Sequence, residues 1–429
     1  LELSQLCSRV RGPAVRLDQI QDLHKISKQK VEKEFKVAPD VVKYLDSFPE
    51  YQVLKDKLPR TLLRKYKTPE SMYLINKSTA INLAKSIRAH LNESDPVIEV
   101  NPGLGLLSQE ILKLYKGHIH MFEINSHFSK NLDALKLKYP DRISYKIADF
   151  FGMWKLAFQD KIDQGNRITD LLGDLATNDN DRIVKILGSM PGLSFVKHLI
   201  NSTVFHSGCS QLGRPDLFIT MPVQRFDFLT DSEIVQGKHK SLPALFQLLF
   251  DFKVLNTVPT VHFLPWTHPT GTKKVTFIDE QRLYLVNITR KPILPCPEEY
   301  LPLLWYFFKP HVFSKSTRVI PMLEQWIPGC GVWLITGQDP PDSKKDVAPG
   351  SDDSPLPHMT IFTEFGDLTL KQKLTVFKKF VSWPEFEQCQ FRTTMENNLP
   401  KTVAQPGDDK DPTATHIDDI DHSDSEADT

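Results

Sequence analysis

The sequence has few of the features that mark disulfide-rich, metal-binding or membrane-spanning proteins. Its five cysteines are odd in number and widely scattered, at Cys7, Cys209, Cys296, Cys330 and Cys389. No two of them form a Cys-x-x-Cys pair, which argues against a disulfide framework or a zinc site and indicates a reducing compartment. The 14 histidines show no metal-ligand spacing, so we expect no metal site. No apolar run approaches the roughly 20 residues that a membrane-spanning helix needs, so we expect no membrane partner.

The chain also lacks a net charge, because Lys and Arg total 53 residues and Asp and Glu total the same number. The charges are unevenly distributed: residues 407–429 contain nine acidic residues and one lysine. The segment 55–67 contains six cations and one anion, and the segment 25–36 is rich in lysine. A basic body with an acidic tail favours a polyanionic partner, with the tail as an internal competitor for it. The alternative for the tail alone is a solubilising disordered segment.

With 429 residues, the chain is long enough for two or three domains. We expect a partly helical, basic N-terminal extension at 1–60, an α/β domain at 61–292 and a small helical domain at 293–400. That last domain is interrupted by a flexible insertion at 337–357, rich in Pro, Asp and Ser, and a disordered acidic tail follows at 401–429. The chain begins at Leu1, and its first segment contains arginines, which is compatible with the remains of a transit peptide.

Strand-like and helix-like segments alternate in the second of these regions. Strands are expected at 97–100, 118–124, 143–150, 182–190 and 216–223. Such alternation predicts a parallel sheet with helices on both faces. Two later strand-like segments, 254–264 and 281–290, are expected to complete the sheet.

The turn after the first expected strand has the composition of a nucleotide-binding loop. Gly103 and Gly105 stand between that strand and a helix, where the backbone must turn sharply and approach a ligand. Glu123 lies 18 residues after Gly105 at the end of the next strand, where a carboxylate can accept both hydroxyls of a ribose. Asp149 ends the following strand, where it can accept from an adenine amino group. The alternative for each carboxylate is a helix cap.

Two details of the loop separate dinucleotides from other ligands. A third glycine is missing, and Glu99 lies inside the first strand. Both details point away from NAD and favour S-adenosylmethionine. The fold class that we predict is therefore α/β: a Rossmann-like S-adenosylmethionine-dependent methyltransferase domain with a small helical C-terminal domain.

Several segments together resemble the ribosomal RNA adenine dimethyltransferase family. The segment 71–87 is similar to the family's opening Gln-Asn-Phe-Leu-x-Asp motif, and 97–112 is similar to its glycine loop. The segments 121–125 and 147–151 resemble its ribose and adenine motifs, and 185–200 falls where its catalytic Asn-Leu-Pro-Tyr belongs. The resemblance covers about residues 61–292, and the mitochondrial branch of the family is the most similar.

The resemblance implies a role for individual residues. Leu74, Glu123 and Asp149 would contact S-adenosylmethionine, and Asn101, Gly103 and Gly105 would shape the loop. The family's opening Gln-Asn is replaced by Ser71 and Met72, so one polar contact to the cofactor is lost. The cofactor implied is S-adenosylmethionine, in a pocket that such departures make vestigial.

The catalytic motif departs further from the family, since the chain has Ser189, Met190, Pro191 and Gly192 there. Methylation of an adenine amine requires a flipped base that is held in plane, and the family's asparagine and tyrosine hold it. If each contact contributes about 2 kcal/mol, losing both lowers the rate on the order of a thousandfold. The alternative is that a more distant aromatic such as Phe195 replaces the ring. We predict that no intact catalytic residue remains.

Three functions follow as hypotheses. The resemblance to the mitochondrial branch implies a transcription initiation factor, monomeric and located in the mitochondrial matrix nucleoid, which joins the mitochondrial RNA polymerase and helps melt promoter DNA. The segments 25–36 and 55–67 are then candidate DNA contacts, with a solvated helix face as the alternative. The second hypothesis is an active adenine N6-dimethyltransferase of the small-subunit rRNA. The third is an rRNA-binding assembly factor with neither activity.

Two other features have a structural interpretation. His262, beside Pro265 and Trp266, is expected to pack at the end of the sheet. The aromatic run Trp305–Phe308 is expected in the core of the C-terminal domain, with a polymerase contact as the alternative.

Overall fold

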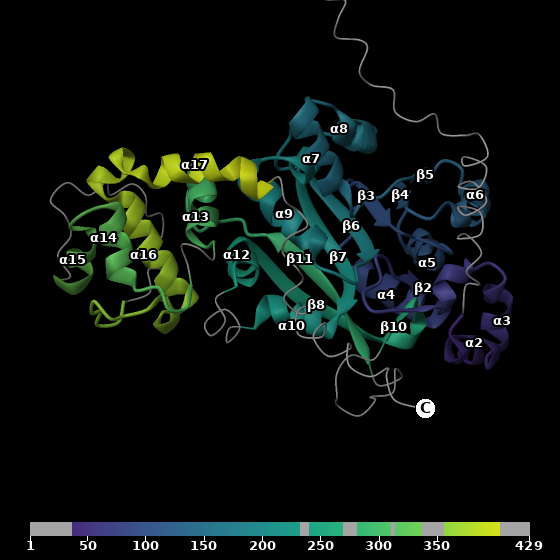
Figure 1. Cartoon of the computed structure of the whole chain (residues 1–429). Coiled ribbons are helices and arrows are strands. Elements are labelled where there is room, and N and C mark those ends of the chain that lie inside the picture. Colours follow the sequence, from purple (N-terminus) through teal and green to yellow (C-terminus); the bar gives the residue numbers. More distant parts are fainter. Residues whose placement is uncertain (1–36, 232–239, 269–280, 310–313, 337–355, 404–429) are drawn as a thin grey trace, which may run out of the picture. The chain divides into compact units, whose positions relative to one another are not determined.

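A computed structural model describes residues 37–231, 240–268, 281–309, 314–336 and 356–403 (Figure 1). The lysine-rich segment 25–36, nearly all of the insertion predicted at 337–357 and the acidic tail from 404 onward lie outside the described residues. The chain forms two compact units that divide between Lys65 and Tyr66.

The first unit consists of short helices. These are α2 (Pro39–Asp46), α3 (Pro49–Lys55) and the 3-10 helix η1 (Arg60–Leu63). Each of α2 and α3 begins with a proline and has an acidic residue in its first turn and a lysine in its last, an order that suits the helix dipole. The amide of Ala38 donates to the carbonyl of Leu63 at 2.8 Å, which ties the start of the unit to its end.

The second unit is built on a seven-stranded sheet with the order β5-β4-β3-β6-β7-β11-β8 (Figure 1). Its strands are β3 (Val97–Val100), β4 (Ile119–Glu123), β5 (Ile143–Ile147), β6 (Ile183–Ser189), β7 (Arg214–Pro222), β8 (Phe250–Pro259) and β11 (Arg282–Arg290). The first five are parallel, and β11 runs antiparallel to both β7 and β8. All five predicted parallel strands are confirmed, and the two later segments do complete the sheet. Of these two, β11 runs antiparallel to its neighbours, so β8 has the same direction as the parallel strands.

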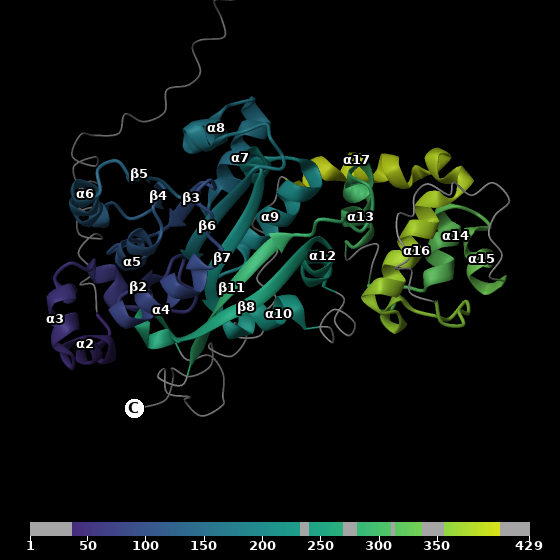
Figure 2. The same ribbon diagram turned by 180° about the vertical axis from the view of Figure 1, so that it is seen from behind.

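Helices cover both faces of this sheet (Figure 2). One face is covered by α4 (Lys77–Arg88), α5 (Leu106–Leu114) and α6 (Ser129–Lys138). The other face is covered by α7 (Met153–Asp163), α8 (Arg167–Leu172), α9 (Ser194–Phe205), α10 (Val223–Thr230) and α12 (Ser241–Leu249). Successive residues of β3 point to opposite faces of the sheet. Val97 packs in the core beneath α4, α5 and α6, and Ile98 packs in the core on the other face.

The helical C-terminal part is confirmed and belongs to the same compact unit as the sheet. Its helices are α13 (Leu301–Phe307), α14 (Val319–Trp326), α15 (Cys330–Thr336), α16 (Leu370–Ser382) and α17 (Gln390–Val403). The run Trp305–Phe308 is buried, as predicted for a core segment. Trp305 donates from Nε1 to Oδ1 of Asn201 on α9 at 3.1 Å, which attaches this part to the sheet domain. Within the described ranges, no helix is long and apolar enough to span a bilayer.

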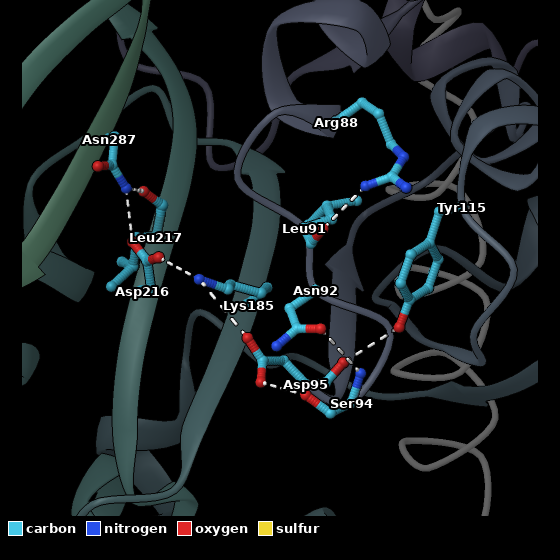
Figure 3. Close-up of polar contacts among 10 residues, drawn as sticks. All are labelled: Arg88, Leu91, Asn92, Ser94, Asp95, Tyr115, Lys185, Asp216, Leu217 and Asn287. Carbon is cyan, nitrogen blue, oxygen red and sulfur yellow. Dashed lines mark hydrogen bonds and ion pairs between the residues drawn. The ribbon is translucent and has the colours of Figure 1, made fainter.

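A buried ion-pair cluster joins three strands at the amino-terminal edge of the parallel strands (Figure 3). The ammonium of Lys185 on β6 lies 2.6 Å from Oδ2 of Asp216 on β7 and 3.8 Å from Oδ2 of Asp95, just before β3. Asn287 on β11 donates to Oδ1 of Asp216 at 2.5 Å. Lys185 is only 7% exposed, so this buried cluster is expected to stabilise the sheet. It lies at the edge opposite the predicted ligand site.

Candidate functional site

The predicted loop connects β3 to α5 with three residues in the left-handed region. Asn101, Gly103 and Gly105 have φ of 55°, 56° and 68°. Asn101 is held there because its amide donates to the carbonyl of Phe122 at 2.7 Å and its side-chain oxygen accepts from the amide of Ile124 at 3.3 Å. Asparagine tolerates this conformation better than most residues, and glycine tolerates it best. The three predicted loop residues therefore have the backbone conformation that their types suggest.

Gly103 is required for a second reason, since a side chain packs directly against it. A Cβ at this position would lie 2.6 Å from Cδ1 of Tyr73. In a nucleotide-binding loop, glycine makes room for the ligand. Here the room at Gly103 is filled by the Tyr73 ring, which also packs on Phe128 with 4.9 Å between ring centroids.

Glu123 lies at the end of β4, as predicted, but its carboxylate is fully buried and already bonded. Oε1 accepts from the Tyr73 hydroxyl at 2.9 Å and from the amide of Asn125 at 2.8 Å. Oε2 accepts from the amide of Gly103 at 2.9 Å. Burial raises the pKa of this carboxyl, and the three donors offset part of that rise. The residue predicted to bind the ribose is therefore bonded to the protein itself.

Asp149 follows β5 and caps the next turn. Its Oδ1 accepts from the amide of Gly152 at 2.8 Å, and its Oδ2 lies 3.4 Å from the ammonium of Lys155. Gly152 is the N-cap of α7, which has no side-chain cap bond, so Asp149 stabilises the turn before the helix and does not cap the helix itself. One third of the side chain remains exposed, so the carboxylate is also accessible from outside.

Leu74 belongs to a short strand next to the loop. This strand, β2 (Tyr73–Leu74), pairs antiparallel with β9 (Phe263–Leu264), and Asn76 then caps α4 by accepting from the amide of Thr79 at 2.8 Å. Nδ1 of His262 lies 2.7 Å from the Thr79 hydroxyl, so His262 packs and hydrogen-bonds as predicted for a structural residue. These contacts fix the position of Tyr73 and Leu74 beside the glycine loop.

Glu99 is the second buried carboxyl of the site. It is 2% exposed, and its Oε2 has no hydrogen-bond partner among the described residues. Burial raises the pKa of this carboxyl to about 7, and the nearby negative charge of Glu123 adds to the effect. The side chain lines a small cavity between the loop and Ser189.

Replacing Glu99 with glutamine is expected to make stability less sensitive to alkaline pH. Because the folded-state pKa lies above the ordinary value of 4.5, the stabilising contribution is complete below that value and is lost as pH rises through about 7. Between about pH 5 and about pH 8, the variant should therefore gain about 2–3 kcal/mol of unfolding free energy relative to the parent. Urea unfolding at both pH values measures this difference. Glu93 is exposed, so Glu93→Gln is the control. Equal pH dependence of Glu99→Gln and the parent would contradict the raised pKa of Glu99.

The acceptor motif lies at the end of β6. Ser189 is half-buried and lines the same small cavity, and the amide of Met190 donates to the carbonyl of Thr220 at 2.8 Å. Pro191 and Gly192 are also half-buried, and a Cβ at Gly192 would meet no atom within 4 Å. The segment thus has open space where the family carries an aromatic ring.

Phe195 is not the replacement for that ring. It is 1% exposed and packs in the core against Phe151, with ring centroids 4.9 Å apart, and against Phe150 at 6.1 Å. The helix α9 thus places this side chain in the core. The alternative in which Phe195 replaces the ring is therefore wrong.

The residues beside the loop fit S-adenosylmethionine by type. A cavity of about 20 Å³ lies between the loop and Ser189, bounded by Leu74, Glu99 and Asn101. In the described conformation Glu123 is bonded within the protein, and Tyr73 packs against Gly103.

Sequence reasoning missed Tyr73. The family's opening motif has a phenylalanine at this position, to which the tyrosine adds a hydroxyl. The contact that gives it meaning joins residues 50 apart in the chain. The added hydroxyl beside a predicted ribose-binding carboxylate was the signal that could have revealed it.

The doubly wound sheet with an antiparallel final strand, the glycine loop and the acidic residues at the following strand ends define the class of Rossmann-like S-adenosylmethionine-dependent methyltransferases. The family model described as "Ribosomal RNA adenine dimethylase" matches residues 64–332. The chain belongs to this family.

The chain is also similar to several known proteins. The chain is 33% identical over 392 residues to "Dimethyladenosine transferase 2, mitochondrial" of Drosophila melanogaster, covering 84% of this chain and 85% of that protein. Among solved structures, it is similar to the 23S rRNA methyltransferase ErmE, with 13% identity and a TM-score of 0.43 over 72% of this chain and 99% of the other. A dimethyladenosine transferase from Plasmodium falciparum is 12% identical, with a TM-score of 0.39 over 70% and 94%.

Proposed function

We propose that this chain is a mitochondrial transcription initiation factor that acts with the mitochondrial RNA polymerase in promoter melting, on a methyltransferase scaffold that no longer methylates. The proposal is supported by the contacts on both sides of the site, where the methyl donor and the acceptor base would bind. On the donor side, the Glu123 carboxylate is bonded to Tyr73 and to Gly103. On the acceptor side, Gly192 stands in open space instead of an aromatic ring.

These two observations favour a role without catalysis. Methyl transfer needs the sulfonium and a flipped adenine in one cavity, with the amine held in plane. The cavity between the loop and Ser189 measures only about 20 Å³ in this conformation. Ser189 and Gly192 provide neither the amide oxygen nor the stacking ring that would orient the base. The scaffold is then free to serve a nucleic-acid partner in another way.

The remaining support for transcription comes from the relatives and from charge. The Drosophila melanogaster relative is named as mitochondrial, which favours that organelle, and we propose the matrix nucleoid as the site of action. In the first unit, Lys55 and Lys65 are paired with Asp46 and Asp40. Lys57 and Arg60 are exposed, and such cations suit DNA phosphates.

A run-off transcription assay with purified mitochondrial RNA polymerase tests the proposal. On a duplex promoter, RNA should appear only when this chain is added, whereas a template with a premelted start site should need it much less. The double variant Lys57→Ala/Arg60→Ala should weaken the duplex reaction more at low salt than at high salt, because the loss of phosphate contacts makes binding less dependent on salt. Transcription from the duplex that does not depend on the chain would refute the proposal.

An active adenine N6-dimethyltransferase of the small-subunit rRNA is the second candidate. It is favoured by the loop conformation at Gly103 and Gly105 and by Glu123 and Asp149, which all stand where the family would need them. Incubation with methyl-labelled S-adenosylmethionine and an rRNA helix 45 hairpin decides between the two. We expect no dimethyladenosine above background, and robust formation would favour the enzyme.

A further inference from the structure

Tyr73 adds one group to the methyl-donor site that its opening motif does not require. Its ring is 1% exposed and fills the space above Gly103, where a Cβ would come within 2.6 Å of it. Its hydroxyl donates to Oε1 of Glu123 at 2.9 Å. Phenylalanine could pack on Phe128 in the same way but could not make this bond.

We propose that the Tyr73 hydroxyl determines whether this site takes S-adenosylmethionine, by occupying the carboxylate that would otherwise bind the ribose. The proposal rests on the proposed function, in which the chain works without the methyl donor. It goes beyond that function because it names the group that closes the site. Tyr73 is a specificity-determining residue in this sense and takes no part in any reaction.

The hydrogen bond between Tyr73 and Glu123 is effective because both residues are buried. Glu123 is fully buried, and its oxygens already accept from the amides of Asn125 and Gly103. A ribose hydroxyl that binds Oε1 must replace Tyr73, and the phenol would then lose a bond to a buried carboxylate. Hydrogen bonds to charged groups of this kind correspond to roughly a ten- to hundredfold change in affinity.

The surroundings of Tyr73 reinforce its position. The strand β2 is paired with β9, and the amide of Ile75 donates to the carbonyl of His262 at 2.9 Å. The backbone on both sides of Tyr73 is thus held, so the Glu123 carboxylate becomes accessible only if the Tyr73 side chain rotates. In Tyr73→Phe, this rotation breaks the packing of the ring but no hydrogen bond.

Isothermal titration of the full chain with S-adenosylhomocysteine, a stable relative of the donor, tests the proposal. The parent should show no saturable binding below about 1 mM, and Tyr73→Phe should bind roughly ten- to hundredfold more tightly than the parent. A ligand-induced rise in the melting temperature of Tyr73→Phe should accompany the binding.

Two further variants serve as controls. Tyr145→Phe removes another tyrosine hydroxyl, which donates to Oδ1 of Asp133 at 2.5 Å outside the site, and it should leave affinity at the parent value. Tyr73→Phe/Glu123→Ala should lose the gained affinity, because the ribose acceptor is gone. Tyr73→Leu removes both the hydroxyl and the ring and provides a second variant if Tyr73→Phe folds poorly.

The outcomes are distinct. Tighter binding by Tyr73→Phe, with no change in Tyr145→Phe, supports the proposal. Equal affinity of parent and Tyr73→Phe overturns it, whether both bind or neither does, since the hydroxyl would then decide nothing. The run-off assay uses the parent chain without cofactor, so a failure here leaves the transcription result standing, and a failure there leaves the binding result standing.

Discussion

Replacing Lys185 with methionine is expected to lower the free energy of unfolding by about 3–5 kcal/mol. The substitution keeps the length of the side chain and removes its charge, which leaves Asp216 and Asp95 without their cation. Lys185 is 7% exposed, so water cannot replace the lost partner. Urea unfolding followed by circular dichroism measures the change.

A pair that is exposed on both sides separates burial from distance. Lys55 on α3 lies 2.7 Å from Asp46, close to the 2.6 Å between Lys185 and Asp216, but the side chains of Lys55 and Asp46 are 31% and 49% exposed. Lys55→Met should therefore cost at most about 1 kcal/mol. If both variants lost equal stability, the buried Lys185 cluster would contribute no more to the free energy of unfolding than an exposed ion pair.

Replacing Phe307 with alanine is expected to cost about 3–5 kcal/mol, through the lost burial and the cavity left behind. Its ring is fully buried and contacts the rings of Phe365, Phe377 and Phe380 in the C-terminal helices. Phe362, in the same part of the chain, is 65% exposed, so Phe362→Ala should cost less than about 1 kcal/mol.

This substitution also tests the domain boundary predicted at residue 292. Phe307 belongs to a hydrophobic core that continues from the C-terminal helices to Ile186 and Ile219 of the sheet. A shared core predicts one cooperative transition that shifts as a whole in Phe307→Ala. Two separate transitions, of which only one shifts, would show that the helical part folds independently.

Most of the sheet could be predicted because its signal is local. The strands β3, β6 and β7 are rich in apolar residues, with Val or Ile in each, and turn residues separate them from helices. The reversed direction of β11 could not be predicted, because strand direction depends on which neighbours pair, and Leu285 pairs with both Thr220 and Asn256. Pairing over such separations is a property of the folded chain.

The types of residue in the candidate site could be predicted from the sequence, but the contacts that they make could not. Asn101, Gly103 and Gly105 could be read from the loop composition because their backbone conformation is a local demand. The bond between Tyr73 and Glu123 could not, since β2 reaches the loop only through its pairing with β9. Burial of Phe195 was missed for the same reason, because the direction of a helical side chain follows from packing on the sheet.

The open space around Gly192 has a consequence for how this scaffold could be re-engineered. The donor side of the site has one group more than the family's motif, the Tyr73 hydroxyl, whereas the acceptor side has one ring fewer, at Gly192. A Cβ at position 192 would meet no atom within 4 Å, so this position can carry a side chain. A designer who wished to install methyl transfer on this scaffold would therefore remove the hydroxyl of Tyr73 on β2 and add a ring at Gly192, in the connection between β6 and α9.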